Sequence, residues 1–399
     1  APQTSPLSFT RAAAFGADNA APSVCMAIAQ FEAHGWPQIF TTSAAAGGVP
    51  DFGESVVWRS GPVPRYMESA VTIVATPGPT WCTDSSTPAV TVADLNHDIV
   101  PDVLLTCAAE ATTTILYGQG GGVFSPPTPH TSASSASAIV ATLAADFDSD
   151  GHIDVLTLSA DGSLSLPLTP TPITTVGSPR WMAAVDANAD GAVDLLIGGS
   201  LATAVLVHPA NAPVLLDSLP GGIRLHIVGN FRAATAAVDL AFATATPNTV
   251  YVALANPSSV ALQHAYLPPT AHVVSANPVA LTAGQYDSNA LVDIVVALDS
   301  GDVVVLADGA TGATSVLANS LPSIVALHLF ATEADGGMLL VSTLTGYVWL
   351  SPLGRYPFDA PPAAAAASLG IGDLSGNGAP DIITASPTAL ALSRGVLVL

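Results

Sequence analysis

The sequence predicts an all-β fold, a single β-propeller in which four-stranded sheets are arranged around a central axis. Three observations predict this fold. Short acidic loops recur along the 399 residues, each loop is flanked by short apolar runs typical of strands, and no stretch has the 3.6-residue periodicity of a long helix. Repeats of about 40 to 50 residues without helices are typical of propeller blades.

The clearest acidic loop carries aspartates at relative positions 1, 3, 5 and 9, with Gly151 at position 6 to permit a sharp reversal. Alternate side chains of such a loop face inward, so the carboxylates converge on one point that suits a hard cation such as Ca²⁺. The predicted ligands are the side chains of Asp146, Asp148, Asp150 and Asp154 and the backbone carbonyl of His152.

The same spacing recurs in four other loops, of which the one that starts at Gln285 is the weakest because it lacks the first acid. The sequence therefore predicts about four or five calcium ions. The predicted ligands, with a backbone carbonyl at the seventh position, are Asp94, Asn96, Asp98, Val100 and Asp102; Asp186, Asn188, Asp190, Ala192 and Asp194; Gln285, Asp287, Asn289, Leu291 and Asp293; and Asp373, Ser375, Asn377, Ala379 and Asp381.

Three further segments keep the frame of the loop but have lost most of its acids: Gln30–Phe40, Asn230–Asp239 and Leu329–Leu340. The second of them contains Arg232 inside the loop. No ion is expected in these three segments. First positions at 30, 94, 146, 186, 230, 285, about 331 and 373 are separated by 40 to 64 residues, which gives eight repeats.

Each repeat is expected to start with the inner strand of a blade, followed by the loop and three more strands. Eight blades are the favoured count, and seven is the alternative if the first or seventh repeat is not a blade. The expected organisation is an N-terminal arm at 1–22, in which Ser8–Phe15 could form an outer closing strand, and a propeller at 23–399. The expected blades are 23–87, 88–137, 138–178, 179–221, 222–275, 276–321, 322–361 and 364–399. The expected inner strands are Val24–Ala29, Val90–Ala93, Val140–Ala145, Trp181–Val185, Ile223–Val228, Val279–Ala283, Ile324–Phe330 and Ser368–Ile371.

The pattern apolar-Ala-Asp-Phe-Asp-x-Asp-Gly-x-x-Asp-apolar at 144–156 resembles the FG-GAP or VCBS repeat propellers, which are related to the integrin α-subunit head. The resemblance implies that the loop joins the innermost strand of a blade to its second strand and that calcium there is structural. Gly-Ala-Pro occurs only at 378–380, and Phe-Gly only at 15–16 and 52–53, so the chain is closer to the looser VCBS-like variant. No partner-binding residue is carried over.

Composition excludes several classes of partner. The formal net charge is −22, from 30 acidic and 8 basic residues, and a nucleic-acid partner would require clustered basic side chains. Half of the residues are hydrophobic, but no uninterrupted run approaches the length of a transmembrane helix.

We expect a secreted or cell-surface protein. The start Ala-Pro-Gln-Thr resembles the end left by signal-peptide removal. Calcium loops of modest charge fill at about 10⁻⁴ to 10⁻³ M, a concentration found outside the cytosol. The three cysteines fit one disulfide and one thiol, with Cys82–Cys107 preferred and Cys25 as the alternative partner of either. The Ser/Thr/Pro-rich connectors near 125–137 and 168–175 are expected to be linkers that could carry O-linked sugars.

The predicted function is a binding or structural module in an extracellular assembly or in adhesion, without enzymatic activity. An EF-hand would need flanking helices and a glutamate at position 12, where Thr157 and Ile197 stand instead. A lectin is the alternative, with tryptophans as sugar platforms, and an enzyme using the central channel is the third hypothesis. The tryptophans do not recur at one blade position: Trp36, Trp58, Trp81, Trp181 and Trp349.

Overall fold

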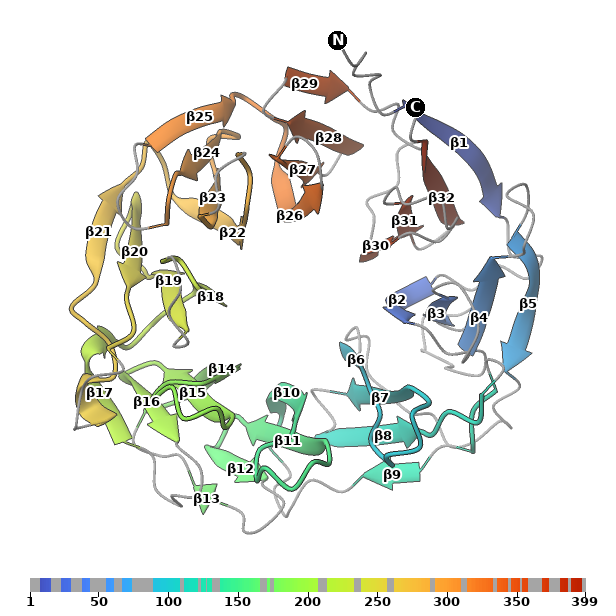
Figure 1. The fold of residues 1–399 in the computed structure, drawn as a ribbon, viewed down its shortest axis with the longest axis horizontal. Coiled ribbons are helices and arrows are strands. Elements are labelled where there is room, and N and C mark those ends of the chain that lie inside the picture. Colours follow the sequence, from blue (N-terminus) through green and yellow to red (C-terminus); the bar gives the residue numbers. More distant parts are fainter. Residues whose placement is uncertain are drawn as a thin grey trace.

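The fold is a ring of eight four-stranded antiparallel sheets, seen in a computed structural model (Figure 1). This structure describes residues 8–15, 23–29, 38–43, 55–60, 67–73, 89–107, 111–120, 123–126, 128–130, 137–165, 171–172, 176–206, 214–232, 238–256, 262–287, 291–309, 314–332, 336–343, 346–351, 354–357, 368–372, 381–386 and 389–396. The all-β prediction is confirmed.

Seven of the sheets are each built from one continuous segment, and their strands follow chain order from the inside of the ring outward (Figure 1). Their strands are β2 (Ser23–Ala29), β3 (Gln38–Ser43), β4 (Ser55–Ser60) and β5 (Met67–Ile73); β6 (Ala89–Ala93), β7 (Asp102–Cys107), β8 (Thr112–Leu116) and β9 (Thr128–His130); β10 (Ile139–Ala145), β11 (Asp154–Ser159), β12 (Ser163–Ser165) and β13 (Thr171–Pro172); β14 (Pro179–Val185), β15 (Asp194–Gly199), β16 (Ala202–Leu206) and β17 (Val214–Pro220); β18 (Leu225–Gly229), β19 (Asp239–Ala243), β20 (Thr249–Ala253) and β21 (Thr270–Val273); β22 (Pro278–Gly284), β23 (Asp293–Leu298), β24 (Val303–Leu306) and β25 (Thr314–Ala318); and β26 (Ile324–Thr332), β27 (Gly336–Thr343), β28 (Gly346–Ser351) and β29 (Gly354–Pro357). A short 3₁₀-helix, η1 (Leu262–His264), precedes β21.

The eighth sheet joins the two ends of the chain. Its inner three strands are β30 (Ser368–Gly372), β31 (Asp381–Ser386) and β32 (Ala389–Val396), and its outer strand is the N-terminal β1 (Ser8–Phe15). β1 pairs antiparallel with β32 from Ser8 opposite Val396 to Phe15 opposite Leu390. On the other side, β2 contacts β30, so the first and last repeats are neighbours in the ring (Figure 1).

Burial within a sheet depends on its distance from the outer edge. Every residue of the second strands β7, β15, β19 and β23 is buried. The outer strands β9, β21 and β25 are mostly exposed. A second strand such as Asp-Ile-Val-Val-Ala-Leu of β23 is apolar without alternation because neighbouring sheets cover both of its faces.

The hydrophobic core lies between adjacent sheets. One cluster packs Leu196 and Val205 of one sheet with Leu240 and Phe242 of the next, and all four are fully buried. Comparable clusters occupy the three other sheet interfaces between β10 and β29. Each buried side chain of this size contributes about 1.5–3 kcal/mol, so sheet-to-sheet packing holds the ring together.

Candidate metal centres

The described acidic loops each connect an inner strand to the second strand of the same sheet. The first loop position directly follows β6, β10, β14 or β22, and the ninth position is the first residue of β7, β11, β15 or β23. The strands are paired at the base of the loop, as between Ala145 and Asp154. The ends of the hairpin therefore fix the first and ninth ligand positions relative to each other.

Backbone hydrogen bonds shape the loop that starts at Asp146. The Asp146 carboxylate accepts the N–H groups of Asp150 (Oδ1, 3.1 Å) and Gly151 (Oδ2, 3.1 Å). Oδ1 of Asp148 accepts the Asp150 N–H at 3.2 Å, and Oδ1 of Asp150 accepts the His152 N–H at 2.8 Å. These contacts turn the first three acids toward the concave side of the loop.

The loops at 94 and 186 repeat this scheme bond for bond. In each, the first acid accepts the N–H groups of positions 5 and 6, and the side chains at positions 3 and 5 accept those of positions 5 and 7. Their position-3 residue is Asn96 or Asn188, whose amide also donates to the acid at position 5, at 2.9 and 2.8 Å. Three independent stretches of sequence thus adopt one geometry.

This geometry requires left-handed backbone at positions 4 and 6. The sixth position has φ of 88° at both Gly151 and Gly191, and 71° at Ile99. Glycine adopts this conformation without steric cost, whereas a β-branched residue is strained there. Ile99 is also 92% exposed, so no packing compensates for the strain.

The ninth-position aspartate is a buried brace between strands, a role that the sequence pattern did not predict. Asp102 is fully buried; its Oδ2 accepts the Leu95 N–H at 2.7 Å, and its Oδ1 accepts the Gly118 N–H, from beyond β8, at 2.7 Å. Asp293 likewise accepts N–H groups from Tyr286 at 2.9 Å and from Asp308 at 3.0 Å. One carboxylate thereby connects the acidic loop to the turn that follows the third strand.

Burial makes two of these carboxylates harder to ionise. Desolvation raises the pKa of Asp102 and of Asp154, and the backbone hydrogen bonds they accept oppose the shift. The nearby acids Asp98, for Asp102, and Asp148, for Asp154, raise the pKa further. A bound cation would compensate for both costs, because it offsets lost hydration and like-charge repulsion.

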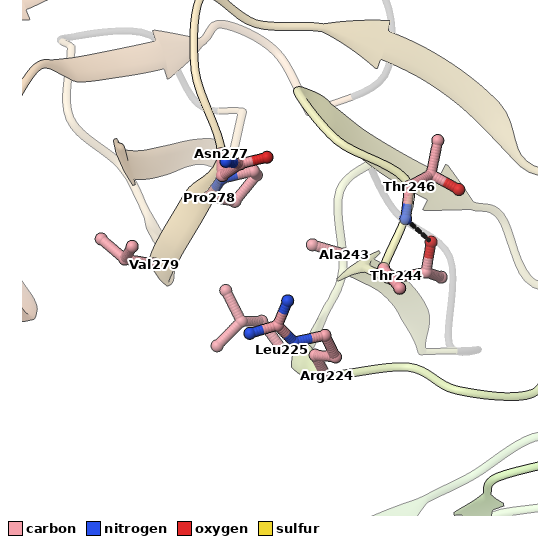
Figure 2. Close-up of a pocket in the computed structure, with 9 residues that line it drawn as sticks. Arg224, Leu225, Ala243, Thr244, Thr246, Asn277, Pro278 and Val279 are labelled. Carbon is pink, nitrogen blue, oxygen red and sulfur yellow. Dashed lines mark hydrogen bonds between the residues drawn. The ribbon is translucent and has the colours of Figure 1, made fainter. Parts of the chain in front are cut away.

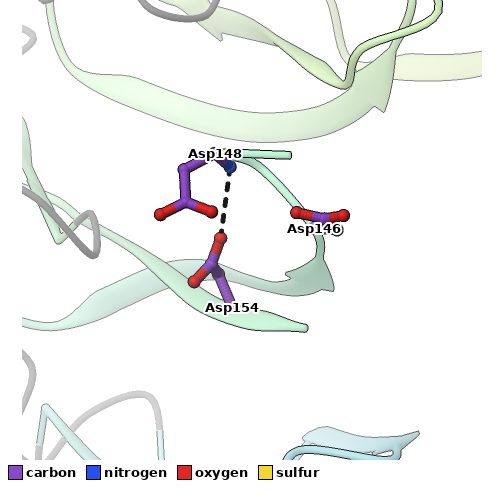
Figure 3. Close-up of side chains that lie close together, drawn as sticks. All are labelled: Asp146, Asp148 and Asp154. Carbon is purple, nitrogen blue, oxygen red and sulfur yellow. Dashed lines mark hydrogen bonds between the residues drawn. The ribbon is translucent and has the colours of Figure 1, made fainter. Parts of the chain in front are cut away.

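Asp146, Asp148 and Asp154 come together as the sequence predicts. Each offers a carboxylate oxygen within 4.8 Å of the others (Figure 3), and the Asp148 N–H donates to Asp154 at 3.4 Å. Asp150 is outside this group. In the described parts of the loops at 94 and 186, no three acids gather within that distance.

A second three-acid group lies in the weakest predicted loop, and one of its members was not predicted. Asp287 and Asp293 are joined there by Asp308, from the turn after β24. Asp308 precedes Gly309, so from the sequence alone it reads as an ordinary turn residue. It supplies an acid to a loop in which Gln285 replaces the first aspartate.

In the fifth repeat, a cationic side chain occupies the loop. The Arg232 guanidinium pairs with the fully buried Asp239, with Nη2 at 2.7 Å from Oδ1, and donates to the Ala255 carbonyl at 2.8 Å. Asp239 keeps the brace, since it accepts the N–H groups of Phe231 at 3.0 Å and of Ala255 at 2.8 Å. Asp239, which corresponds to the ninth position of the acidic loops in a loop that is one residue longer, is thus matched by a positive charge of the protein itself.

Some predicted ligands lie outside the described residues. They are Asn289 and the loop residues Asp373, Ser375, Asn377 and Ala379; the first position of the eroded loop at 30 lies outside them too. Asp381 is described as the first residue of β31 and pairs with Gly372, as the ninth position does in the other loops. Val100, Ala192 and Leu291 lie at the seventh position of their loops.

The available donors fit a hard cation. Every predicted side-chain ligand offers oxygen, and strands rather than helices flank the loops, with Thr157 in β11 and Ile197 in β15. This arrangement suits calcium and is unlike an EF-hand. Within the described acidic loops, nitrogen ligands of the kind that zinc prefers occur only at His97 and His152, which contact each other edge to face with ring centroids 4.6 Å apart, and no cysteine is present there.

The other side chains considered as functional from the sequence are buried, partly buried or bonded where the structure describes them. Trp181 is 7% exposed and stacks on His226, with ring centroids 4.3 Å apart, so it is not a surface platform for a sugar. Burial lowers the pKa of His130, His226, His272 and His328, which favours their neutral forms.

Cys107 is disulfide-bonded, and the choice between Cys25 and Cys82 as its partner stays a prediction. Among the described residues, no helix is long and apolar enough to cross a bilayer.

Comparison with known proteins identifies the repeat. Residues 94–157, which contain the first two acidic loops, match the family model of the FG-GAP-like repeat. No curated protein matches the chain by sequence.

Solved structures share the fold over nearly the whole chain. The computationally designed protein Ika8 has a TM-score of 0.59 at 14% identity, covering 94% of this chain and 98% of its own. BBS1N, solved in complex with ARL6DN and soaked with lead, has a TM-score of 0.52 at 13% identity, covering 98% of both chains. At these identities the likeness shows the fold alone.

Proposed function

We propose that this chain, an FG-GAP-repeat β-propeller, is a secreted, calcium-stabilised module that binds a protein partner in an extracellular assembly. In this proposal its eight sheets are eight blades, and calcium occupies the loops at 94, 146, 186 and 373; the loop at 285, which lacks the first acid, is a fifth candidate site. The propeller supplies a rigid frame with loops at both ends, and loops on a rigid frame carry most binding work.

Arg232 carries the calcium proposal. The loop at 230 keeps the buried aspartate that follows the loop but lacks the acids at positions 1, 3 and 5, and there a guanidinium pairs with that aspartate. This fixed positive charge supports the inference that the buried aspartate needs a cation beside it. In the acidic loops, a bound divalent ion would supply the positive charge that the Arg232 guanidinium supplies in the loop at 230.

Calcium would be held by the predicted side chains and seventh-position carbonyls of each loop. The ion supplies positive charge that offsets the repulsion among the acids and the burial of the ninth-position carboxylate. The chain's own residues fix the inner strand to the second strand through that carboxylate. The role is structural, because the acids accept backbone hydrogen bonds and are tied to the shape of the loop.

An oxidising compartment is consistent with the disulfide at Cys107, since such bonds are rare in the cytosol. Calcium of about millimolar concentration is available in the same extracellular setting, and loops of this kind fill in that range. The lectin alternative has less support, because Trp181 is buried against a neighbouring sheet.

Removal of calcium tests the proposal. At ten to a hundred times its dissociation constant, an ion that binds only the folded state adds about 1.4–2.7 kcal/mol per site. With four sites, excess chelator should lower the melting temperature by roughly 10 °C. Asp148→Ala and Asp190→Ala should each reproduce part of the loss, whereas Asp217→Ala, at an exposed acid in β17, should not. A melting curve that chelator leaves unchanged would contradict the proposal.

A further inference from the structure

The end of the ring opposite the acidic loops carries a small cavity of different character. Each acidic loop follows the C-terminal end of an inner strand, whereas this cavity lies at the N-terminal ends of β18 and β22. It has a volume of about 210 Å³ and lies between two adjacent sheets (Figure 2). The residues that matter for its chemistry are Arg224, Leu225, Thr244, Thr246, Asn277 and Val279.

Arg224 gives the cavity a positive charge. Among the described residues its exposed guanidinium has no ion-pair partner, in contrast to that of Arg232. Its backbone is fixed, because its N–H donates to the Ala243 carbonyl at 2.8 Å, and the preceding turn is held by the Gly222 N–H on the Gly199 carbonyl at 2.8 Å. Arg180 also has no ion-pair partner among the described residues, so what distinguishes Arg224 is the cavity that it lines.

The walls add hydrogen-bond donors. The Thr244 hydroxyl oxygen accepts the Thr246 N–H at 3.1 Å (Figure 2), which leaves its own O–H to donate to a ligand. The acid attached to the opposite wall is already engaged: both carboxylate oxygens of Asp299 accept hydrogen bonds from Asn277, at 2.8 and 3.1 Å. Asp299 is also not part of the cavity lining.

The remaining wall is apolar. Val279 sits at a bulge in β22, where pairing with β23 skips from Pro278 to Ala280, and it is 37% exposed. A bulge redirects a side chain out of the regular alternation of a strand. Val279 and Leu225 therefore offer an apolar surface next to the guanidinium, and Figure 2 shows them on facing sheets.

We propose that this cavity binds a carboxylate group that carries a small apolar side chain. Arginine recognises planar carboxylates through paired N–H donors. A single cation balances a monoanion, whereas phosphate recognition usually draws on clustered basic residues. The volume is below the 300–1,000 Å³ of a pocket for a drug-sized ligand, so it holds one residue. A peptide C-terminus and a free amino-acid derivative share this chemistry.

The site does not depend on the calcium loops. Binding of a peptide with a free C-terminus would also define the protein partner of the proposed function, on which this part of the inference rests. The probes are N-acetyl-leucine, its amide N-acetyl-leucinamide, and a short leucine-ended peptide with a free or an amidated C-terminus. Binding is measured on the calcium-saturated full chain by methyl NMR, with Leu225 and Val279 as reporters. Arg180→Gln is the matched control for Arg224→Gln, because Arg180 is also exposed and occupies the bulge position of β14.

The acid should shift the Leu225 and Val279 resonances and bind at least about tenfold more tightly than the amide. Arg224→Gln should weaken binding of the acid by a similar factor, and Arg180→Gln should leave binding of the acid unchanged. Binding of the free-ended peptide but not of the acetylated amino acid would identify a protein terminus as the source, and the reverse a small metabolite. Four results would each overturn the proposal, whatever the chelator experiment shows. They are equal affinity for acid and amide, an equal loss of affinity for the acid in both variants, tighter binding of inorganic phosphate than of the acid, and Leu225 and Val279 resonances that do not shift.

Discussion

At the scale of single residues, the acidic loop is defined by where its backbone must turn. Positions 4 and 6 adopt left-handed backbone in all three fully described acidic loops, and the two glycines at position 6 have open space around the position of a Cβ. Substitution there is governed by conformation alone. Ile99, the non-glycine residue at position 6, allows the cost of this conformation to be measured.

Replacing Ile99 with glycine should stabilise the protein. The left-handed conformation costs an L-residue about 1–2 kcal/mol, and the extra freedom of glycine in the unfolded chain removes about 0.5–1 kcal/mol of the gain. A net gain of about 0.5–1 kcal/mol should appear as a higher urea midpoint. The converse change, Gly191→Ala, should lower the midpoint, and a loss of stability in Ile99→Gly would show that the strain is absent.

Arg232 allows a second test at this scale. Arg232→Ala leaves Asp239 buried without its cation, and breaking such a pair costs about 3 kcal/mol. The loss should be the same in calcium and in chelator, because the guanidinium is part of the chain. Urea unfolding measures this loss, with Arg224→Ala as the control at an arginine that has no ion-pair partner among the described residues. A loss that calcium restores would mean that the loop binds an ion after all.

At the scale of elements, sheets meet through close approach of inner and second strands. Gly198 in β15 faces the indole of Trp181 in β14, and a Cβ at Gly198 would overlap that ring. The same indole stacks on His226 of the next sheet. A local glycine thereby determines how two blades pack.

Gly198→Ala should therefore destabilise the protein by about 1–3 kcal/mol, the usual cost of overpacking a filled core. A combined Gly198→Ala and Trp181→Leu variant should lose less than the sum of the single changes, because the smaller side chain makes room for the methyl group. Thermal or urea unfolding of the four proteins gives the coupling. Strict additivity would show that the two residues do not compete for space.

The sequence was sufficient to locate most strands and loops of this fold, because both depend on local pattern. The second strands are apolar runs that start on an aspartate, and the structure places β7, β11, β15 and β23 at those residues. What could not be predicted depends on distant segments. The brace from Asp102 to Gly118, the addition of Asp308 to the sixth loop and the hydrogen bond from Arg232 to the Ala255 carbonyl all become visible only when the third strand is placed.

At the scale of the whole molecule, the ring is closed by pairing between its two terminal strands, and its described acidic loops lie at the opposite end of the inner strands from Arg180 and Arg224. The N-terminal strand β1 completes the last sheet, so the ring is held by backbone pairing between the two ends of the chain as well as by packing between sheets. The described acidic loops gather at one end of the inner strands, and Arg180 and Arg224, which have no ion-pair partner among the described residues, lie at the other. The two ends of the ring therefore suit different ligands.

The most direct test is a crystal structure determined in millimolar calcium, with anomalous scattering used to locate the ions. The account predicts ion density in the loops that begin at Asp94, Asp146, Asp186 and Asp373, and none between Arg232 and Asp239. Loops without an ion at that calcium concentration, or an ion bound beside Arg232, would contradict it.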